Sequence, residues 1–170
     1  MSEDEQVDIV DANCNLLHIA FKKEAHEKGL LHKAVIANVI NSKGEWLLTI
    51  PASSRQDPGQ YVSPMGGHVS AGEKDEDALL REVFEELGLK DFKYEFVGRA
   101  IFDRHIIGRH ENHFFIVYKV FSDQEPVLSY EHESHRYFTK EELKKELKEN
   151  PQLFGKPFHF VVKNFYPELS

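Results

Sequence analysis

The pattern of apolar and polar positions predicts strands in the first third of the chain. Residues 7–21 alternate loosely between the two types and predict an N-terminal β-hairpin. The polar stretch 22–28 predicts a short helix that stops at Gly29. The apolar, β-branched run 32–40 is separated by turn residues from a second apolar run, 45–50. This spacing predicts strand, turn and strand.

Helical periodicity appears later, over residues 75–87, and Gly88 is well placed to end that helix. The elements expected after it are two long strands over 92–107 and 113–121, a short strand near 137–138, and helices over 140–149 and 158–166. A chain that runs from strands to helix to strands to helices predicts a mixed-sheet α/β (α+β) fold. One domain over residues 1–170 accommodates all of these elements.

The helix over 75–87 has two chemically distinct sides, because each residue advances roughly 100° around the axis. The apolar residues expected to face the core are Leu79, Leu80, Val83, Phe84 and Leu87. Opposite them, Glu82, Glu85 and Glu86 gather within an arc of roughly 100°. Three carboxylates so placed are either a solvated acidic face or a site for a hard cation, which prefers oxygen ligands.

Composition excludes some classes of function. Lys and Arg number 21 against 29 Asp and Glu, a net charge of −8, which argues against holding long nucleic acid through its phosphates. Cys14 is the sole cysteine, so neither an intrachain disulfide nor a cysteine-based zinc site can form. The acidic N-terminus does not have the pattern of a secretion signal, and no apolar run reaches membrane-spanning length. We expect a cytoplasmic protein without a membrane partner.

One spaced motif surrounds the glutamates. Gly67, Glu73, Arg81, Glu82, Glu85, Glu86 and Gly88 follow the spacing G-x5-E-x7-R-E-U-x-E-E-x-G-U, with Val83 and Leu89 at the two bulky aliphatic positions U. The segment 67–89 thereby resembles the signature of the Nudix hydrolases at every specified position. The resemblance implies a Nudix fold: an α/β/α sandwich with a mixed sheet and a loop–helix–loop catalytic motif.

The resemblance also implies roles for these residues. It makes Glu82, Glu85 and Glu86 ligands of Mg2+, or of Mn2+ as a substitute, joined by the backbone carbonyl near Gly67. Glu73 and Arg81 become supporting residues at the catalytic and substrate-binding site, with Arg81 tying the loop to the helix. An ordinary i,i+4 ion pair between Arg81 and Glu85 is a compatible alternative.

The implied reaction is hydrolysis of a diphosphate linkage by attack of water on phosphorus, in a nucleoside diphosphate-type substrate (NDP-X or a nucleoside di- or triphosphate). It requires a general base. Members of the family take the base from the motif helix, here Glu85 or Glu86, or from a later loop. Glu131 and Glu133 precede the last predicted strand, and we assign Glu133 to the catalytic set. Two solvated loop carboxylates are the alternative.

Residues upstream of the motif resemble the isopentenyl-diphosphate-isomerase-like branch of the family. They are Gly29–Ala34, Asn41–Leu48 and Gly66–Val69. Isomerases of this fold carry a catalytic cysteine where this chain has Gly66, and Cys14 lies far away in the predicted hairpin. Glu111 does resemble an isomerase active-site glutamate. Isomerisation is therefore an alternative function, and a non-catalytic ligand-binding domain is another.

Other side chains are candidates for substrate contacts. We assign His68, in the loop leading to the metal, and Arg104, near the expected edge of the active site, to substrate binding. Further candidates for phosphate contacts are Arg55, Arg99 and Arg109. The candidates for stacking on the substrate are Tyr61, Phe102, Phe114 and Tyr118, and the alternative is that these aromatic residues pack in the core. His32 could line the same pocket. His105, His110 and His113 lack the spacing of a zinc motif and are expected at the surface or in hydrogen bonds. The partner is a small phosphorylated substrate, and a homodimer is possible.

Overall fold

The computed structural model describes residues 4–106 and 108–170. Met1, Ser2 and Glu3, from the acidic N-terminus, and Ile107, the last residue of the predicted strand 92–107, lie outside the described residues. No helix within the described ranges is long and apolar enough to cross a membrane.

The described residues form one mixed sheet of eight strands, with β3 at its centre. β3 (His32–Ile40) pairs in parallel with β7 (Arg109–Phe121) along its whole length, and β7 pairs in turn with β6 (Lys93–Ile106). The other edge of β3 is shared by β5 (Met65–His68) and β4 (Trp46–Pro51). β8 (His132–Phe138) extends the sheet beyond β4. The long run of apolar residues in β3 reflects burial on both faces.

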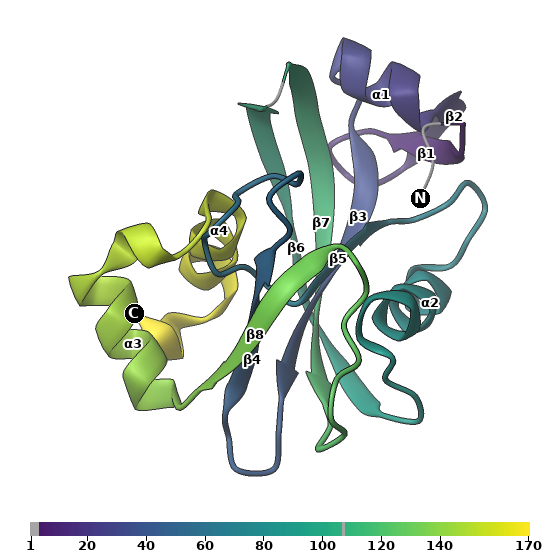
Figure 1. Cartoon of the computed structure of the whole chain (residues 1–170). Coiled ribbons are helices and arrows are strands. Elements are labelled where there is room, and N and C mark those ends of the chain that lie inside the picture. Colours follow the sequence, from purple (N-terminus) through teal and green to yellow (C-terminus); the bar gives the residue numbers. More distant parts are fainter. Residues whose placement is uncertain (1–3, 107) are drawn as a thin grey trace.

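Helices cover both faces of this sheet (Figure 1). Alternate residues of β3 enter different cores: Ala34 and Ile36 pack toward α4 (Lys156–Phe165), whereas Val35 and Val39 pack toward α2 (Asp75–Leu87). α3 (Lys140–Glu149) and the short 3-10 helices η1 (Pro151–Leu153) and η2 (Pro167–Leu169) lie on the α4 side. This arrangement confirms the predicted α/β/α sandwich.

The N-terminal hairpin consists of β1 (Gln6–Val10) and β2 (Leu16–Phe21), and it is followed by α1 (Lys22–Lys28). β1 joins the main sheet at the start of β3, where Ile9 faces His32. The hairpin and α1 therefore lie beside the beginning of β3, and α1 also contacts β7 (Figure 1). This placement carries residues of α1 to the same end of the sheet as the start of β3.

α2 has the predicted bounds, but the helix is rotated about its axis relative to the orientation that the apolar pattern predicted. It ends at Gly88, whose φ of 66° lies in the left-handed region that glycine tolerates. Leu79, Val83 and Leu87 are fully buried as expected, but Leu80 and Phe84 are 42% and 48% exposed. The expectation that those two face the core is wrong. The helix is turned so that Glu82 and Glu86 lie at the edge of its buried face instead.

Candidate active site

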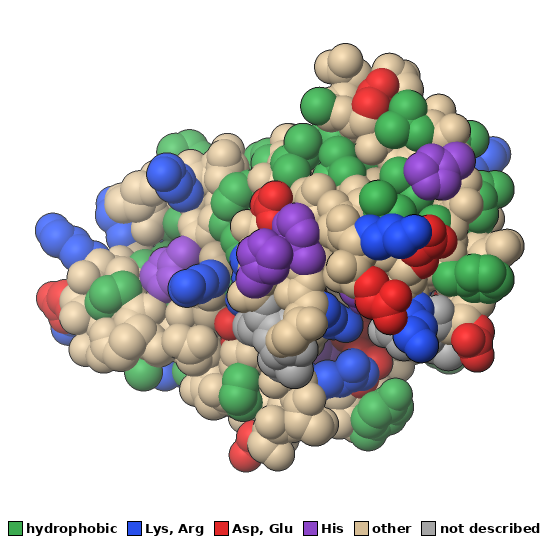
Figure 2. Space-filling view, turned by 90° about the horizontal axis from the view of Figure 1, so that it is seen from above, with side chains coloured by type: hydrophobic (Ala, Val, Ile, Leu, Met, Phe, Trp, Pro, Cys, Tyr) green, Lys and Arg blue, Asp and Glu red, His purple; other side chains and the backbone are tan. Residues whose placement is uncertain are grey.

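A cavity of about 310 Å3 opens at the junction of β3, β5, β7 and α2. This size is within the range of sites for small ligands. Apolar side chains of the sheet and α4 form part of its wall, among them Ile36, Phe115 and Val161. Its charged lining consists of the carboxylates Asp57, Glu82, Glu86, Glu111 and Glu131 and the cations Lys22, Arg55, Arg104 and Arg109. The view from this end of the molecule shows acidic, basic and histidine side chains gathered side by side (Figure 2).

Gly67 leaves room for the side chain of Glu82 beside β5. A Cβ atom on Gly67 would lie 2.3 Å from the carboxyl carbon of Glu82 and 2.7 Å from its Cγ, closer than nonbonded atoms come. Without that Cβ, the Glu82 carboxylate packs directly against the backbone of the strand, and only 8% of its side chain is exposed. The first glycine of the motif is thus required by the position of the first helix glutamate.

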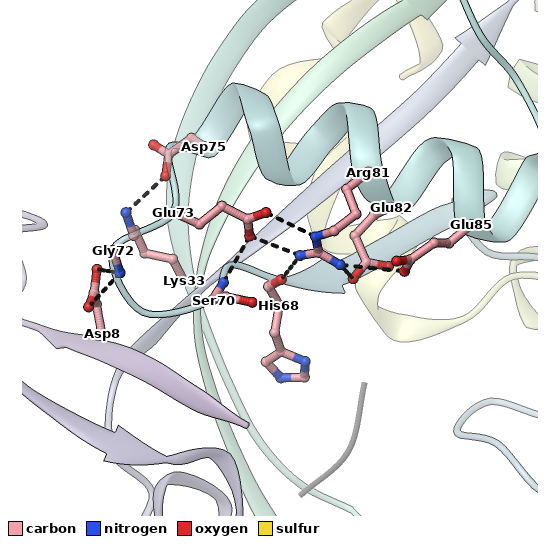
Figure 3. A network of polar contacts seen from close by, with 10 residues as sticks. All are labelled: Asp8, Lys33, His68, Ser70, Gly72, Glu73, Asp75, Arg81, Glu82 and Glu85. Carbon is pink, nitrogen blue, oxygen red and sulfur yellow. Dashed lines mark hydrogen bonds and ion pairs between the residues drawn. The ribbon is translucent and has the colours of Figure 1, made fainter. Parts of the chain in front are cut away.

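Arg81 joins the loop before α2 to the glutamates of the helix (Figure 3). Its guanidinium donates to both carboxylate oxygens of Glu73 at 2.9 Å, to Glu82 at 2.7 Å and to the backbone carbonyl of His68 at 3.2 Å. Glu73 in turn accepts a hydrogen bond from the backbone N–H of Ser70. Arg81 lowers the pKa of the Glu73 carboxyl. Glu73 and Arg81 therefore fix the loop and orient Glu82, and neither lines the cavity.

Glu85 lies next to this network but differs in environment. Its side chain is 54% exposed, it meets Arg81 at 3.4 Å, and it does not line the cavity. The ion pair offered above as an alternative for Arg81 and Glu85 is present, together with the stronger contacts to Glu73 and Glu82. Of the predicted ligands, the structure brings Glu82, Glu86 and Gly67 to the cavity, and Glu85 stands at its outer side.

Glu86 is the most deeply buried of the helix carboxylates. It lies beside the carboxylate of Glu131, and its Oε2 has no hydrogen-bond partner among the described residues. Burial, followed by the adjacent Glu131, raises the pKa of Glu86 well above its ordinary value. Burial likewise raises the pKa of Glu82, against the effect of Arg81. A buried carboxylate with two acidic neighbours, here Glu82 and Glu131, is stabilised by a proton or a cation, so this donor set fits a hard divalent ion.

The loop before β8 contributes Glu131 to the cavity, and Glu133 lies outside it. Glu131 lines the cavity and pairs with Arg55 at 2.5 Å, whereas Glu133 is exposed. Glu131 and Glu133 would share one face of a regular strand. β8 begins only at His132, where its pairing with β4 shifts register between Ile50 and Pro51, so this alternation does not extend to Glu131. The expectation that both carboxylates precede the last strand is wrong for Glu133, which lies inside β8, and only Glu131 reaches the cavity.

Arg104 and Arg109 line the cavity together and share the carboxylate of Glu111. Arg104 donates to both oxygens of Asp57, at 3.1 and 2.9 Å, and to Glu111 at 3.0 Å. Arg109 meets the other oxygen of Glu111 at 3.1 Å. These guanidinium groups are held rigidly by carboxylates, and their charge is largely balanced before any ligand arrives. Arg99, the remaining arginine candidate, stacks on Phe96 away from the cavity.

Four histidines meet at the α1 end of the cavity: His26, His32, His68 and His113, here called the histidine cluster. One ring nitrogen from each lies within 4.8 Å of the others. Burial lowers the pKa of His26 to about 3 and that of His32 to about 4, and those of His68 and His113 lie well below the usual value. Neutral imidazoles are the form that binds transition metals.

Sequence spacing missed the histidine cluster because its members come from α1, β3, β5 and β7. The expectation that His113 is a surface or hydrogen-bonding residue holds only in its second part, since it is buried and 3.2 Å from His68. His105 and His110 stack on each other outside the cavity. His32 lies opposite His113 in the parallel pairing of β3 with β7. The sheet topology brings these two histidines together, and their spacing in the sequence does not reveal it.

The remaining candidates divide between cavity and core. Phe102 lines the cavity, whereas Tyr61 packs on Phe138 and Phe154, and Phe114 and Tyr118 are buried in the sheet. Gly66 lines the cavity as well. Cys14 occupies the turn between β1 and β2, outside the cavity lining.

The site therefore combines the acidic residues of α2, a glycine that makes room for Glu82, and an arginine that joins loop and helix. The sequence model described as the NUDIX domain matches residues 30–156, and the chain belongs to the Nudix hydrolase family. The family resemblance stated from the motif is thereby confirmed.

Individual relatives agree with this assignment. Isopentenyl-diphosphate Delta-isomerase 2 of Photorhabdus laumondii is 32% identical over 131 residues, covering 74% of this chain and 72% of the relative. An uncharacterised Nudix hydrolase of Streptomyces coelicolor is 35% identical, covering 60% of this chain and 58% of its own length. A crystal structure from Deinococcus radiodurans has a TM-score of 0.73 at 20% identity, covering 94% of this chain and 98% of that one, and supports the fold.

Proposed function

We propose that this enzyme hydrolyses a diphosphate linkage in a small nucleotide-like substrate, with Mg2+ held by the motif carboxylates. The observation that carries the proposal is the convergence of Glu82, Glu86 and Glu131 on one cavity. Mg2+ in this position would neutralise phosphoryl oxygens and lower the pKa of a water. Glu82 and Glu86 would hold it, with Glu85 at the outer side and the carbonyl of Gly67 beside Glu82.

The charge of the cavity supports a requirement for the cation. Its lining has five carboxylates against four cationic side chains, and the guanidinium groups of Arg104 and Arg109 already bind carboxylates. A diphosphate that entered without a counterion would meet a net negative lining. A divalent ion at Glu82 and Glu86 reverses this balance, after which Arg55, Arg104 and Arg109 can bind phosphate oxygens.

We assign the general base to Glu131 and not to Glu133. Glu131 lies beside Glu86 and belongs to the cavity lining, so it can accept a proton from a water positioned there. Arg55, 2.5 Å away, holds the carboxylate in place. His68 and Phe102 stand where the remainder of the substrate would lie.

We also propose that the histidine cluster holds a transition metal ion. Its four imidazoles are neutral and converge, and His32 Nε2 is buried without a hydrogen-bond partner among the described residues. Metal analysis after growth with zinc and manganese should find about one ion per chain, reduced in His32→Ala and His113→Ala but not in the control His135→Ala. Equal metal content in all four proteins would refute this assignment.

Isomerisation of a prenyl diphosphate is the second candidate, favoured by relatives that bear the isomerase name. Gly66 stands where the isomerases carry their cysteine, and Cys14 cannot reach the cavity from its turn. A panel of nucleotides, nucleotide sugars and prenyl diphosphates, with and without Mg2+, decides between the two. We expect Mg2+-dependent phosphate-containing products that are lost in Glu85→Gln and Glu86→Gln. Isomerised prenyl diphosphate without hydrolysis would overturn the proposal.

A further inference from the structure

The strand β2 lies at the outer edge of the sheet and exposes apolar side chains (Figure 1). Among the described strands it pairs with β1 alone. The side chains of Leu17, Ile19 and Phe21 are 60%, 52% and 52% exposed, and their spacing of two residues places them on one face of the strand. Ala20 points to the other face, where it is buried with Val7.

The backbone at this edge is oriented for pairing with another strand. Lys22 donates its N–H to the carbonyl of Glu5 at 2.8 Å, so these two residues form a hydrogen-bonded pair of the β1–β2 ladder. Bonded and non-bonded pairs alternate along an antiparallel ladder. Phe21 and Ile19, which lie one and three positions before Lys22, therefore point their N–H and C=O groups away from β1.

The sequence of β2, LLHIAF, contains no lysine, acidic residue or proline. Edge strands commonly carry such residues, because an open row of N–H and C=O groups otherwise pairs with another chain. In β2 the open backbone and the apolar side chains of Leu17, Ile19 and Phe21 occur together. A strand added at this edge would bury part of the apolar surface and bond the outward backbone groups.

We propose that two copies of this chain associate by antiparallel pairing of β2 with β2, on a two-fold axis at Ile19. In that register Ile19 faces Ile19 of the second copy, and Leu17 faces Phe21. A shift by two residues would instead place Leu17 opposite Lys23, or Phe21 opposite Asn15. The backbone has the matching phase, since the outward groups of Ile19 make it a bonded pair. The interface is therefore self-complementary, as a two-fold axis requires.

The charges at the two ends of β2 also fit a second copy. Lys23 is exposed just after Phe21, and Asp11 lies at the other end, where it accepts from the backbone N–H of Asn15 at 2.9 Å. Antiparallel pairing brings the Lys23 end of each copy to the Asp11 end of the other, so opposite charges meet twice.

The contact is small, because it is formed by one six-residue strand from each copy. Stable complexes typically bury about 1,600 Å2 in total, and smaller interfaces belong to weak association. We therefore expect a dimer that dissociates on dilution. Residues 16–21 do not line the cavity, so the pairing does not depend on the proposed function and substitutions in β2 leave the active site intact.

Sedimentation velocity from about 1 μM to about 300 μM protein tests the association, since this range spans weak complexes. The wild type should sediment faster as its concentration rises. Ile19→Lys sets two like charges opposite each other at the axis and should stay monomeric throughout. The matched control His18→Lys adds the same charge at an exposed position on the other face and should associate like the wild type. A monomeric wild type, or equal association of Ile19→Lys, would overturn the proposal.

Disulfide trapping tests the register, in a Cys14→Ser background. The Cα atoms of a bonded antiparallel pair are about 5.5 Å apart, a distance that a disulfide spans. Ile19→Cys should therefore oxidise to a covalent dimer. Leu17→Cys and Phe21→Cys should each stay monomeric alone, because equal positions lie about 14 Å apart along the strand, and should cross-link when mixed. Equal cross-linking of all three single variants, or none in Ile19→Cys, would refute the two-fold pairing.

Discussion

The substitution Glu86→Gln separates the effect of the Glu86 carboxylate on stability from its effect on Mg2+-dependent activity. Glu86 is buried, its Oε2 has no partner among the described residues, and Glu131 stands beside it. A neutral amide removes the buried charge and the repulsion, and its N–H can donate to Glu131. Unsatisfied buried groups of this kind cost about 1–3 kcal/mol. We therefore expect the metal-free variant to be more stable, while losing Mg2+-dependent activity.

The assay is thermal unfolding in EDTA near pH 8, where about 1–3 kcal/mol raises the melting temperature of a chain of this size by roughly 2–12 °C. The folded-state pKa of Glu86 is raised, so the wild type loses stability as pH rises from the ordinary carboxyl pKa through the raised one. The gain in the variant should therefore shrink toward pH 4–5. The matched control is Glu85→Gln, whose exposed side chain predicts a change within about 0.5 kcal/mol. A lower melting temperature for Glu86→Gln than for Glu85→Gln would show that the buried Glu86 carboxylate does not destabilise the metal-free protein.

Three further predictions test other parts of the account. Gly67→Ala places a Cβ 2.3 Å from the carboxyl carbon of Glu82, so it should cost about 1–3 kcal/mol by denaturant unfolding and abolish most activity; wild-type kcat would contradict the close approach. Arg81→Lys cannot reproduce the two-pronged bond to Glu73 and should lower activity with little change in fold, as checked by kinetics and circular dichroism. The histidine cluster has lowered pKa values, so the metal-free protein should lose stability as pH falls from 7 toward 4; a flat melting temperature over that window would argue against buried neutral rings.

Local signals in the sequence were sufficient for the elements whose boundaries are set by local chemistry. The bounds of α2 followed from its periodicity and from Gly88, and the capping box of Thr139 and Glu142 is formed at the start of α3. The strand β3 also has its predicted limits. By contrast, the glycine-rich β5 has no strand-like pattern, and its existence depends on pairing with β3.

The parts of the site that could not be predicted depend on tertiary contacts. Periodicity placed Leu80 and Phe84 in the core, but the packing of α2 against β5 turns the helix so that Glu82 and Glu86 are buried instead. The motif located the acidic helix, and it contained no information on which residues face it across the cavity. The inward position of His132 arises from a register shift between two strands, which no local pattern records.

The proposed function depends on one step, the attack of water on phosphorus in a diphosphate held by this cavity. Turnover of the active member of the substrate panel in H2 18O, with Mg2+, tests it directly by mass spectrometry of the products. We predict one 18O atom in a phosphate-containing product and none in the Glu86→Gln reaction. Unlabelled phosphate groups accompanied by a rearranged carbon skeleton or double bond would contradict hydrolysis and would establish the isomerase alternative.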